Sequence, residues 1–147
     1  MENAGIKEKG VSILKVLVKA EPLLFYVLLF AHLIPIFTAC WFITVDGPAH
    51  LYNSKLLLEI ANGNPVISDY LSFNSAILPN WIGHFLLSVF LGIFEASLAE
   101  KLVLSLYIVS LPMAFRLLLK SVKAKNVVAL YFIFPVTFSF LFYFGFH

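Results

Sequence analysis

Charged residues are scarce in this sequence, and cysteine is almost absent. Only 12% of the 147 residues are Asp, Glu, Lys or Arg, whereas soluble domains contain about 25%. A domain of this size buries too little of its surface to hide an apolar fraction of 61%, so the composition excludes an ordinary soluble fold. The single cysteine, Cys40, cannot form an intrachain disulfide, and its apolar neighbours predict a buried side chain.

The sequence also lacks a basic face with interleaved aromatic residues, which excludes nucleic acid as a predicted partner. It contains no internal repeat and no low-complexity linker. The positive charges instead fall into two groups beside long apolar runs, a pattern typical of residues that orient membrane helices. The groups are Lys7, Lys9, Lys15 and Lys19, and then Arg116, Lys120, Lys123 and Lys125.

Long apolar runs are what the sequence does contain. Residues 22–45 carry no formal charge and, at about 1.5 Å per residue, are long enough to cross a bilayer core of about 30 Å. Pro35 lies within this run and predicts a kink. The run is too long for a signal peptide and lacks a clear cleavage site, so we expect a retained span. Residues 1–21 before it are expected to be cytoplasmic and interfacial.

Three later apolar runs predict further spans, at residues 80–95, 101–120 and 126–147. The intervening residues 46–79 are the only long segment with many polar residues, and we expect them to form an external loop. Within this loop the spacing of Leu and Ile over residues 48–61 predicts an amphipathic helix. Residues 66–79 predict either irregular structure or a second short surface helix.

We therefore predict an all-α fold, a polytopic transmembrane helix bundle of about four hydrophobic helices. One or two short amphipathic interfacial helices would lie in the first external loop. Residues 1–147 would form a single membrane module, and their apolar end predicts the N-terminal fragment of a longer chain. The basic N-terminus predicts a cytoplasmic start. Three full crossings would then place Arg116 and the lysines after it outside, so either residues 81–94 do not fully cross or the charge rule is overridden.

A carboxylate followed by a tight turn and a histidine marks the exit of the first predicted span. Asp46 has three possible roles: it caps the next helix, acts as a general base toward an acceptor hydroxyl, or helps to hold a divalent cation. His50 has three possible roles as well: it donates a hydrogen bond to a phosphate, acts as a second metal ligand, or is a solvated interfacial residue. One Asp and one His four residues apart do not make a metal site by themselves.

Further polar residues surround this stretch. Tyr52 and Asn53 either line a sugar or phosphate site or are simply solvated. His84 either faces the same cleft as His50 or makes an interhelical hydrogen bond.

Polar residues also lie at the two ends of the third predicted span. Glu100 and Lys101, at its start, are expected to form a terminal charge pair. Arg116 and the lysines after it either contact lipid phosphates or extend to the membrane surface. Each of these residues therefore has a structural and a functional interpretation.

Several short motifs resemble the start of the GT-C type membrane glycosyltransferases, which include protein O-mannosyltransferases, aminoarabinose transferases of lipid A and bacterial relatives. In that superfamily a first span leads to an external loop that opens on an acidic residue. One or two helices lie along the membrane, and a helix that begins near a proline returns into it. The matching motifs are Asp46-Gly47-Pro48-Ala49-His50-Leu51-Tyr52-Asn53, Leu78-Pro79-Asn80-Trp81-Ile82-Gly83-His84, Ala99-Glu100-Lys101-Leu102 and Leu111-Pro112-Met113-Ala114-Phe115-Arg116.

The resemblance implies transfer of a sugar, with inversion, from a polyprenyl-phosphate-linked donor to an acceptor on the non-cytoplasmic face of a bacterial inner membrane. It implies that Asp46 is the catalytic base or a metal-associated carboxylate. His50, Tyr52, Asn53 and His84 would bind substrate. The residue after Asp46 is a glycine and not a second acid, so a divalent cation is left open.

The implied partners are membrane lipid, the polyprenyl-linked donor and further C-terminal spans of the same chain. The 147 residues alone would then be inactive. The alternative is a non-enzymatic polytopic membrane protein, a transporter or scaffold fragment, in which Asp46 is only a helix cap.

Overall fold

The computed structural model describes residues 20–74, 81–124 and 127–144. All regular secondary structure in these residues is helical, as predicted. Two helices are long and apolar enough to cross a membrane, Ala20–Thr38 and α6 (Ala96–Ser121). The expectations for residues 1–19 lie outside the described residues.

The first long helix is interrupted near its middle. Residues 20–31 are helical, residues 32 and 33 form a turn, and α2 (Ile34–Thr38) continues the path. Pro35 lies in the first turn of α2, where its missing N–H costs nothing and its fixed φ suits a helix start. The proline therefore acts as predicted, by interrupting the helical hydrogen bonds just before it.

The helix also ends earlier than the predicted residue 45. Residues 39–45 are not helical, because their backbone groups bond to other segments. Lys101 Nζ donates to the Ala39 carbonyl at 2.6 Å, and the Val45 N–H donates to the Tyr143 carbonyl at 2.8 Å. Cys40 lies in this stretch and is exposed, which contradicts the prediction of a buried thiol.

The helix predicted at 48–61 is present as α3 (Gly47–Ala61), with Pro48 in its first turn. Gly63 ends it with a φ of 72°, a left-handed conformation that favours glycine. α4 (Pro65–Ser68) follows, and the Asn64 side chain caps it by accepting from the Val66 N–H at 3.1 Å. Of the residues predicted to be either irregular or a second short surface helix, 66–68 are helical and 69–74 are not, while 75–79 lie outside the described residues.

Polar side chains tie the end of α3 together. Lys55 Nζ lies 3.0 Å from Glu59 Oε1, and Asn64 Nδ2 donates to Glu59 Oε2 at 2.9 Å. The Asn64 hydrogen bond and the Lys55 ammonium hold the pKa of the Glu59 carboxyl below its usual value. This end of α3 is therefore a polar surface of the protein.

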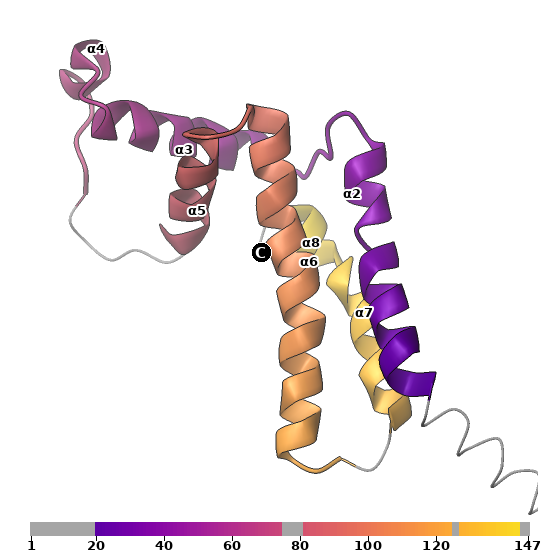
Figure 1. Cartoon of the computed structure of the whole chain (residues 1–147). Helices are drawn as coiled ribbons and strands as arrows, with labels where there is room; N and C mark the ends of the chain where they lie inside the picture. The colour runs from indigo at the N-terminus through magenta and orange to yellow at the C-terminus, as the bar shows by residue number, and fades with distance from the viewer. Residues whose placement is uncertain (1–19, 75–80, 125–126, 145–147) are drawn as a thin grey trace, which may run out of the picture.

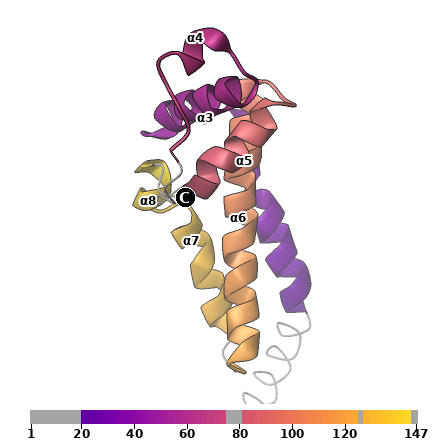
Figure 2. The ribbon, with the colours of Figure 1, turned by 90° about the vertical axis from the view of Figure 1, so that its left-hand side faces the viewer.

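The run predicted as a span at 80–95 forms a much shorter helix. α5 (Trp81–Leu91) contains 11 residues, which corresponds to about 16 Å, roughly half the thickness of a bilayer core. Figures 1 and 2 show that α5 packs under α3 and leads up to the start of α6. α5 therefore returns the chain to the same end of the molecule from which α3 departs.

α6 is longer than the predicted 101–120 and continues through Pro112. Its 26 residues correspond to about 39 Å. The last predicted span, 126–147, is broken within its described residues into η1 (Val127–Phe132), α7 (Ile133–Thr137) and α8 (Phe140–Phe144). Pro135 and the β-branched and aromatic residues around it explain the breaks, since such residues favour a continuous helix only weakly.

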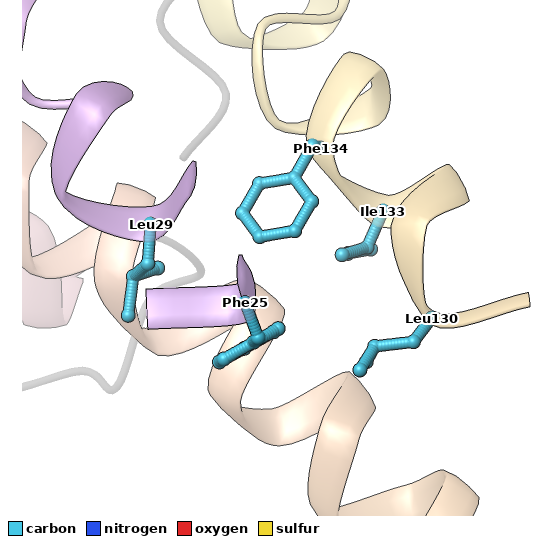
Figure 3. Close-up of a cluster of buried hydrophobic side chains, with 5 residues drawn as sticks. All are labelled: Phe25, Leu29, Leu130, Ile133 and Phe134. Atoms are coloured by element: carbon cyan, nitrogen blue, oxygen red, sulfur yellow. The ribbon is translucent and has the colours of Figure 1, made fainter. Parts of the chain in front are cut away.

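Two apolar clusters hold the long elements together. In the first, Phe25 and Leu29 of the first helix meet side chains of η1 and α7, as Figure 3 shows. In the second, Ile36 of α2 and Phe142 of α8 contact α6. Their remaining buried members are Leu130, Ile133 and Phe134 in the first cluster and Leu104 and Ile108 in the second. The first helix, α6 and α7 therefore run side by side, and α3 lies across one end of them (Figure 1).

The short length of α5 affects how the first helix and α6 are arranged. The first helix begins at the end of the molecule where α6 ends, and Glu21 pairs there with Arg116. Because α5 does not run the length of the bundle, the segments on either side of it do not exchange ends. The start of the first helix and the basic residues Arg116 and Lys120 of α6 therefore lie at the same end of the molecule.

Candidate functional site at the start of α3

Asp46 occupies the N-cap position of α3, as one of the predicted alternatives requires, but its side chain makes no capping hydrogen bond. Its backbone carbonyl accepts the first helical bond, from the His50 N–H at 3.0 Å. Pro48 supplies no N–H to this first turn, which reduces the number of donors that a cap must satisfy. The half-buried carboxylate of Asp46 is therefore not used as a cap.

His50 and His84 contact each other directly. His50 Nδ1 lies 3.0 Å from His84 Nε2, and the ring centroids are 4.8 Å apart. An N–H···N hydrogen bond needs one ring nitrogen that donates and one that accepts, so at least one of the two rings is neutral. The structure thus brings together the two histidines that the sequence placed 34 residues apart, with an interhelical hydrogen bond as one of the predicted outcomes.

A second contact between α3 and α5, one turn further along each helix, supports this pair. Ser88 Oγ donates to the Ser54 carbonyl at 2.9 Å and to the His84 carbonyl at 2.7 Å. Ser54 itself is completely buried, so the two helices approach closely at this point. The positions of both histidines are therefore fixed by packing on rigid helices.

Tyr52 and Asn53 differ in what surrounds them. Asn53 and His84 line a pocket of about 280 Å³ between α3, α5 and the segment at residues 71–74. Tyr52 is 65% exposed and is not part of this lining. Of the residues predicted to bind substrate, the structure therefore gathers His50, Asn53 and His84, and it leaves Tyr52 apart.

A buried acid of α6 lies against the start of α3. Glu100 is only 9% exposed, and a Cβ atom on Gly47 would lie 2.6 Å from its Oε1. The same atom would lie 2.6 Å from Thr44 Oγ1, which has no hydrogen-bond partner among the described residues. Only a glycine at position 47 leaves room for this approach.

The predicted Glu100–Lys101 charge pair is wrong. Lys101 Nζ instead donates to the Ala39 carbonyl, while Glu100 faces the start of α3. Sequence reasoning missed Glu100 as a site residue because it treated the acid as a surface charge. Its position at the start of a long apolar helix was the available signal, since buried acids in such helices are functional candidates. We name Asp46, His50, His84 and Glu100 the polar corner.

Metal ligation has little support in this region. The described ranges 20–74, 81–124 and 127–144 contain no group of three or more His, Cys, Asp or Glu side chains that could hold a metal ion.

Comparison of the chain with protein-family models, curated proteins and solved structures gives no match. The function is therefore argued from the residues themselves.

Proposed function

We propose that the protein is an integral membrane protein in which Ala20–Thr38 and α6 cross the bilayer. Large apolar side chains along both helices, such as Leu23, Phe30 and Leu117, are more than half exposed, which suits contact with lipid or with further helices. The basic group that begins at Arg116 would lie at the cytoplasmic face. The polar corner and α3 would then lie on the non-cytoplasmic side.

We further propose that the chain is the N-terminal part of a GT-C-like glycosyltransferase, with the polar corner in its active site. The observation that carries this proposal is the meeting of α3, α5 and α6: His50 of α3 contacts His84 of α5, and Glu100 of α6 lies against Gly47, the residue that follows Asp46. The order of elements agrees with the superfamily pattern: a first crossing, an acid at its exit, a helix across the membrane face and a returning helix.

In this reaction the acceptor hydroxyl attacks the anomeric carbon of the polyprenyl-linked sugar. A new bond forms between the acceptor oxygen and that carbon, the bond from the carbon to the phosphate oxygen breaks, and polyprenyl phosphate leaves. The Asp46 carboxylate takes the proton of the hydroxyl, acting as general base. His50 and His84 supply an N–H donor for the oxygens of the departing phosphate, and Asn53 orients the sugar.

The substitution Asp46→Asn tests this assignment. It removes the base while keeping the size of the side chain, so we expect sugar transfer by membranes containing the full gene product to fall by about 10²–10⁴-fold. Asp69→Asn is the matched control, because Asp69 is an exposed acid of the same loop. Undiminished transfer by the Asp46 variant would remove Asp46 from the mechanism.

The non-enzymatic alternative makes a different prediction for the same membranes. A transporter or scaffold would transfer no sugar from any polyprenyl-linked donor. Its assembly would also tolerate the replacement of the exposed loop at residues 69–74. Transfer activity in the unmodified protein would exclude this alternative.

A further inference from the structure

A second polar site lies at the far end of α6 from the polar corner. A pocket of about 300 Å³ opens there between the start of the first helix and the end of α6. Its polar lining consists of Glu21, Arg116, Lys120 and Lys123, and apolar side chains of α6 and η1 complete the wall. We call this the basic pocket.

Arg116 is the buried element of the basic pocket. Its side chain is only 9% exposed, and its Nη2 donates to Glu21 Oε2 at 2.9 Å. The guanidinium carbon lies 4.3 Å from the centre of the Phe25 ring, a cation–π contact that holds the group in place. The charged group is thus fixed before any ligand arrives.

The ion pair does not use all of its hydrogen-bonding capacity. Arg116 Nη1 and Glu21 Oε1 are buried, and neither has a hydrogen-bond partner among the described residues. Buried polar atoms without partners are uncommon and point to a missing ligand or to water. A guanidinium with a free donor edge is the group that best recognises phosphate oxygens.

The charge of the basic pocket is positive although Glu21 cancels Arg116. Lys120 and Lys123 are exposed at its rim and leave a net formal charge of +2 among its four ionisable residues. Lys123 adopts a φ of 53°, at the turn that ends α6. This left-handed conformation normally favours glycine or asparagine, so a lysine is kept there at some conformational cost.

We propose that the basic pocket binds the phosphate group of an anionic membrane lipid. The pocket lies at the end of α6, a helix long enough to cross a membrane. If α6 crosses the bilayer as proposed above, the headgroups of the lipids lie at the level of this pocket. The lysines attract the negatively charged surface, and Arg116 provides the specific contact. Glu21 Oε1 would repel a phosphate oxygen, which places the phosphate on the side of Arg116 and the lysines. This proposal does not depend on glycosyl transfer.

The experiment measures lipid retention by native mass spectrometry of the full chain, released from nanodiscs that contain equal amounts of phosphatidylglycerol and phosphatidylcholine. We expect preferential retention of phosphatidylglycerol. The double variant K120Q/K123Q should weaken it about thirtyfold, since each lysine near an anionic surface contributes about 1 kcal/mol and 1.4 kcal/mol is a factor of ten. The control is K55Q, which removes one exposed lysine from α3. Equal retention by the unmodified protein and K120Q/K123Q would overturn the proposal.

A second variant separates recognition by Arg116 from net charge. E21Q/R116Q removes both members of the buried pair, so the pocket keeps its charge of +2 and no buried charge is left alone. We expect about tenfold weaker retention of phosphatidylglycerol, because a hydrogen bond to a charged group is lost. Retention equal to that of the unmodified protein would remove Arg116 from the site.

Inorganic phosphate, added at millimolar concentration and constant ionic strength, distinguishes a lipid from a soluble ligand. No displacement of phosphatidylglycerol is expected, since the lipid also gains from its acyl chains in the bilayer. Complete displacement would assign the pocket to a soluble phosphate compound and overturn the lipid assignment.

Discussion

The polar corner and the basic pocket lie at opposite ends of α6 and are built in different ways. In the polar corner, His50 and His84 contact each other through their ring nitrogens, and Glu100 fits against a glycine. In the basic pocket, two opposite charges are buried as a pair, and an aromatic ring covers the cation. The basic pocket therefore depends on a paired charge, whereas the polar corner depends on close packing.

The largest effect is expected in the basic pocket. Arg116→Ala leaves the Glu21 carboxylate buried without its partner, which should lower the free energy of unfolding by about 3–5 kcal/mol. Denaturation of the full chain in detergent micelles measures this loss. Leu117→Ala is the matched control, because Leu117 is adjacent and 61% exposed. Equal losses of unfolding free energy in the two variants would show that the buried ion pair does not determine stability at this end of the molecule.

A smaller effect is expected in the polar corner. Gly47→Ala places a methyl group 2.6 Å from Glu100 Oε1 and Thr44 Oγ1, so both side chains must move, at a cost of about 1–3 kcal/mol. Gly83→Ala is the control, since nothing lies within 4 Å of its added methyl group, and it should stabilise α5 by about 0.5–1 kcal/mol. Glu100→Ala should partly rescue Gly47→Ala. If Gly47→Ala and Gly83→Ala change the free energy of unfolding with the same sign and size, the close approach of Glu100 to Gly47 is contradicted.

The smallest effect concerns the histidine pair. His50→Ala and His84→Ala should be coupled by about 1 kcal/mol in a double-mutant cycle, because either change removes the same hydrogen bond. His50→Ala combined with His32→Ala is the control, since His32 bonds instead to the Leu28 carbonyl in the first helix. Additive effects for His50 and His84 would mean that their contact contributes nothing to stability.

The sequence predicted the features whose causes are local. The limits of α3 were correct within one residue, because Pro48 favours a helix start and Gly63 a stop. The end of the first helix was not predicted, because residues 39–45 leave the helix to bond with Lys101 and Tyr143, which are far away in sequence. Apolar composition identifies a membrane segment, but it does not locate such long-range breaks.

The candidate site was likewise predicted only where its features are local in the sequence. Spacing alone left Asp46 as a cap and His50 as a solvated residue, and the resemblance to the glycosyltransferases made them site candidates. The position of His84 one turn into the next helix predicted that it could face the same cleft as His50. Glu100 was not predicted as a site residue, because its contact with Gly47 joins α6 to α3, and no short motif predicts how these two helices pack. Its neighbour Lys101 made a charge pair look like the simpler explanation.

We propose that the polar corner and the basic pocket face opposite sides of a membrane, and labelling of cysteines from each side tests this most directly. Cys40 is the only cysteine, so Cys40→Ser gives a background for single cysteines at Ser72, beyond α4, and Ser121, at the end of α6. A membrane-impermeant thiol reagent should label S72C only from the non-cytoplasmic side and S121C only from the cytoplasmic side of oriented vesicles. Labelling of both positions from the same side would contradict the claim.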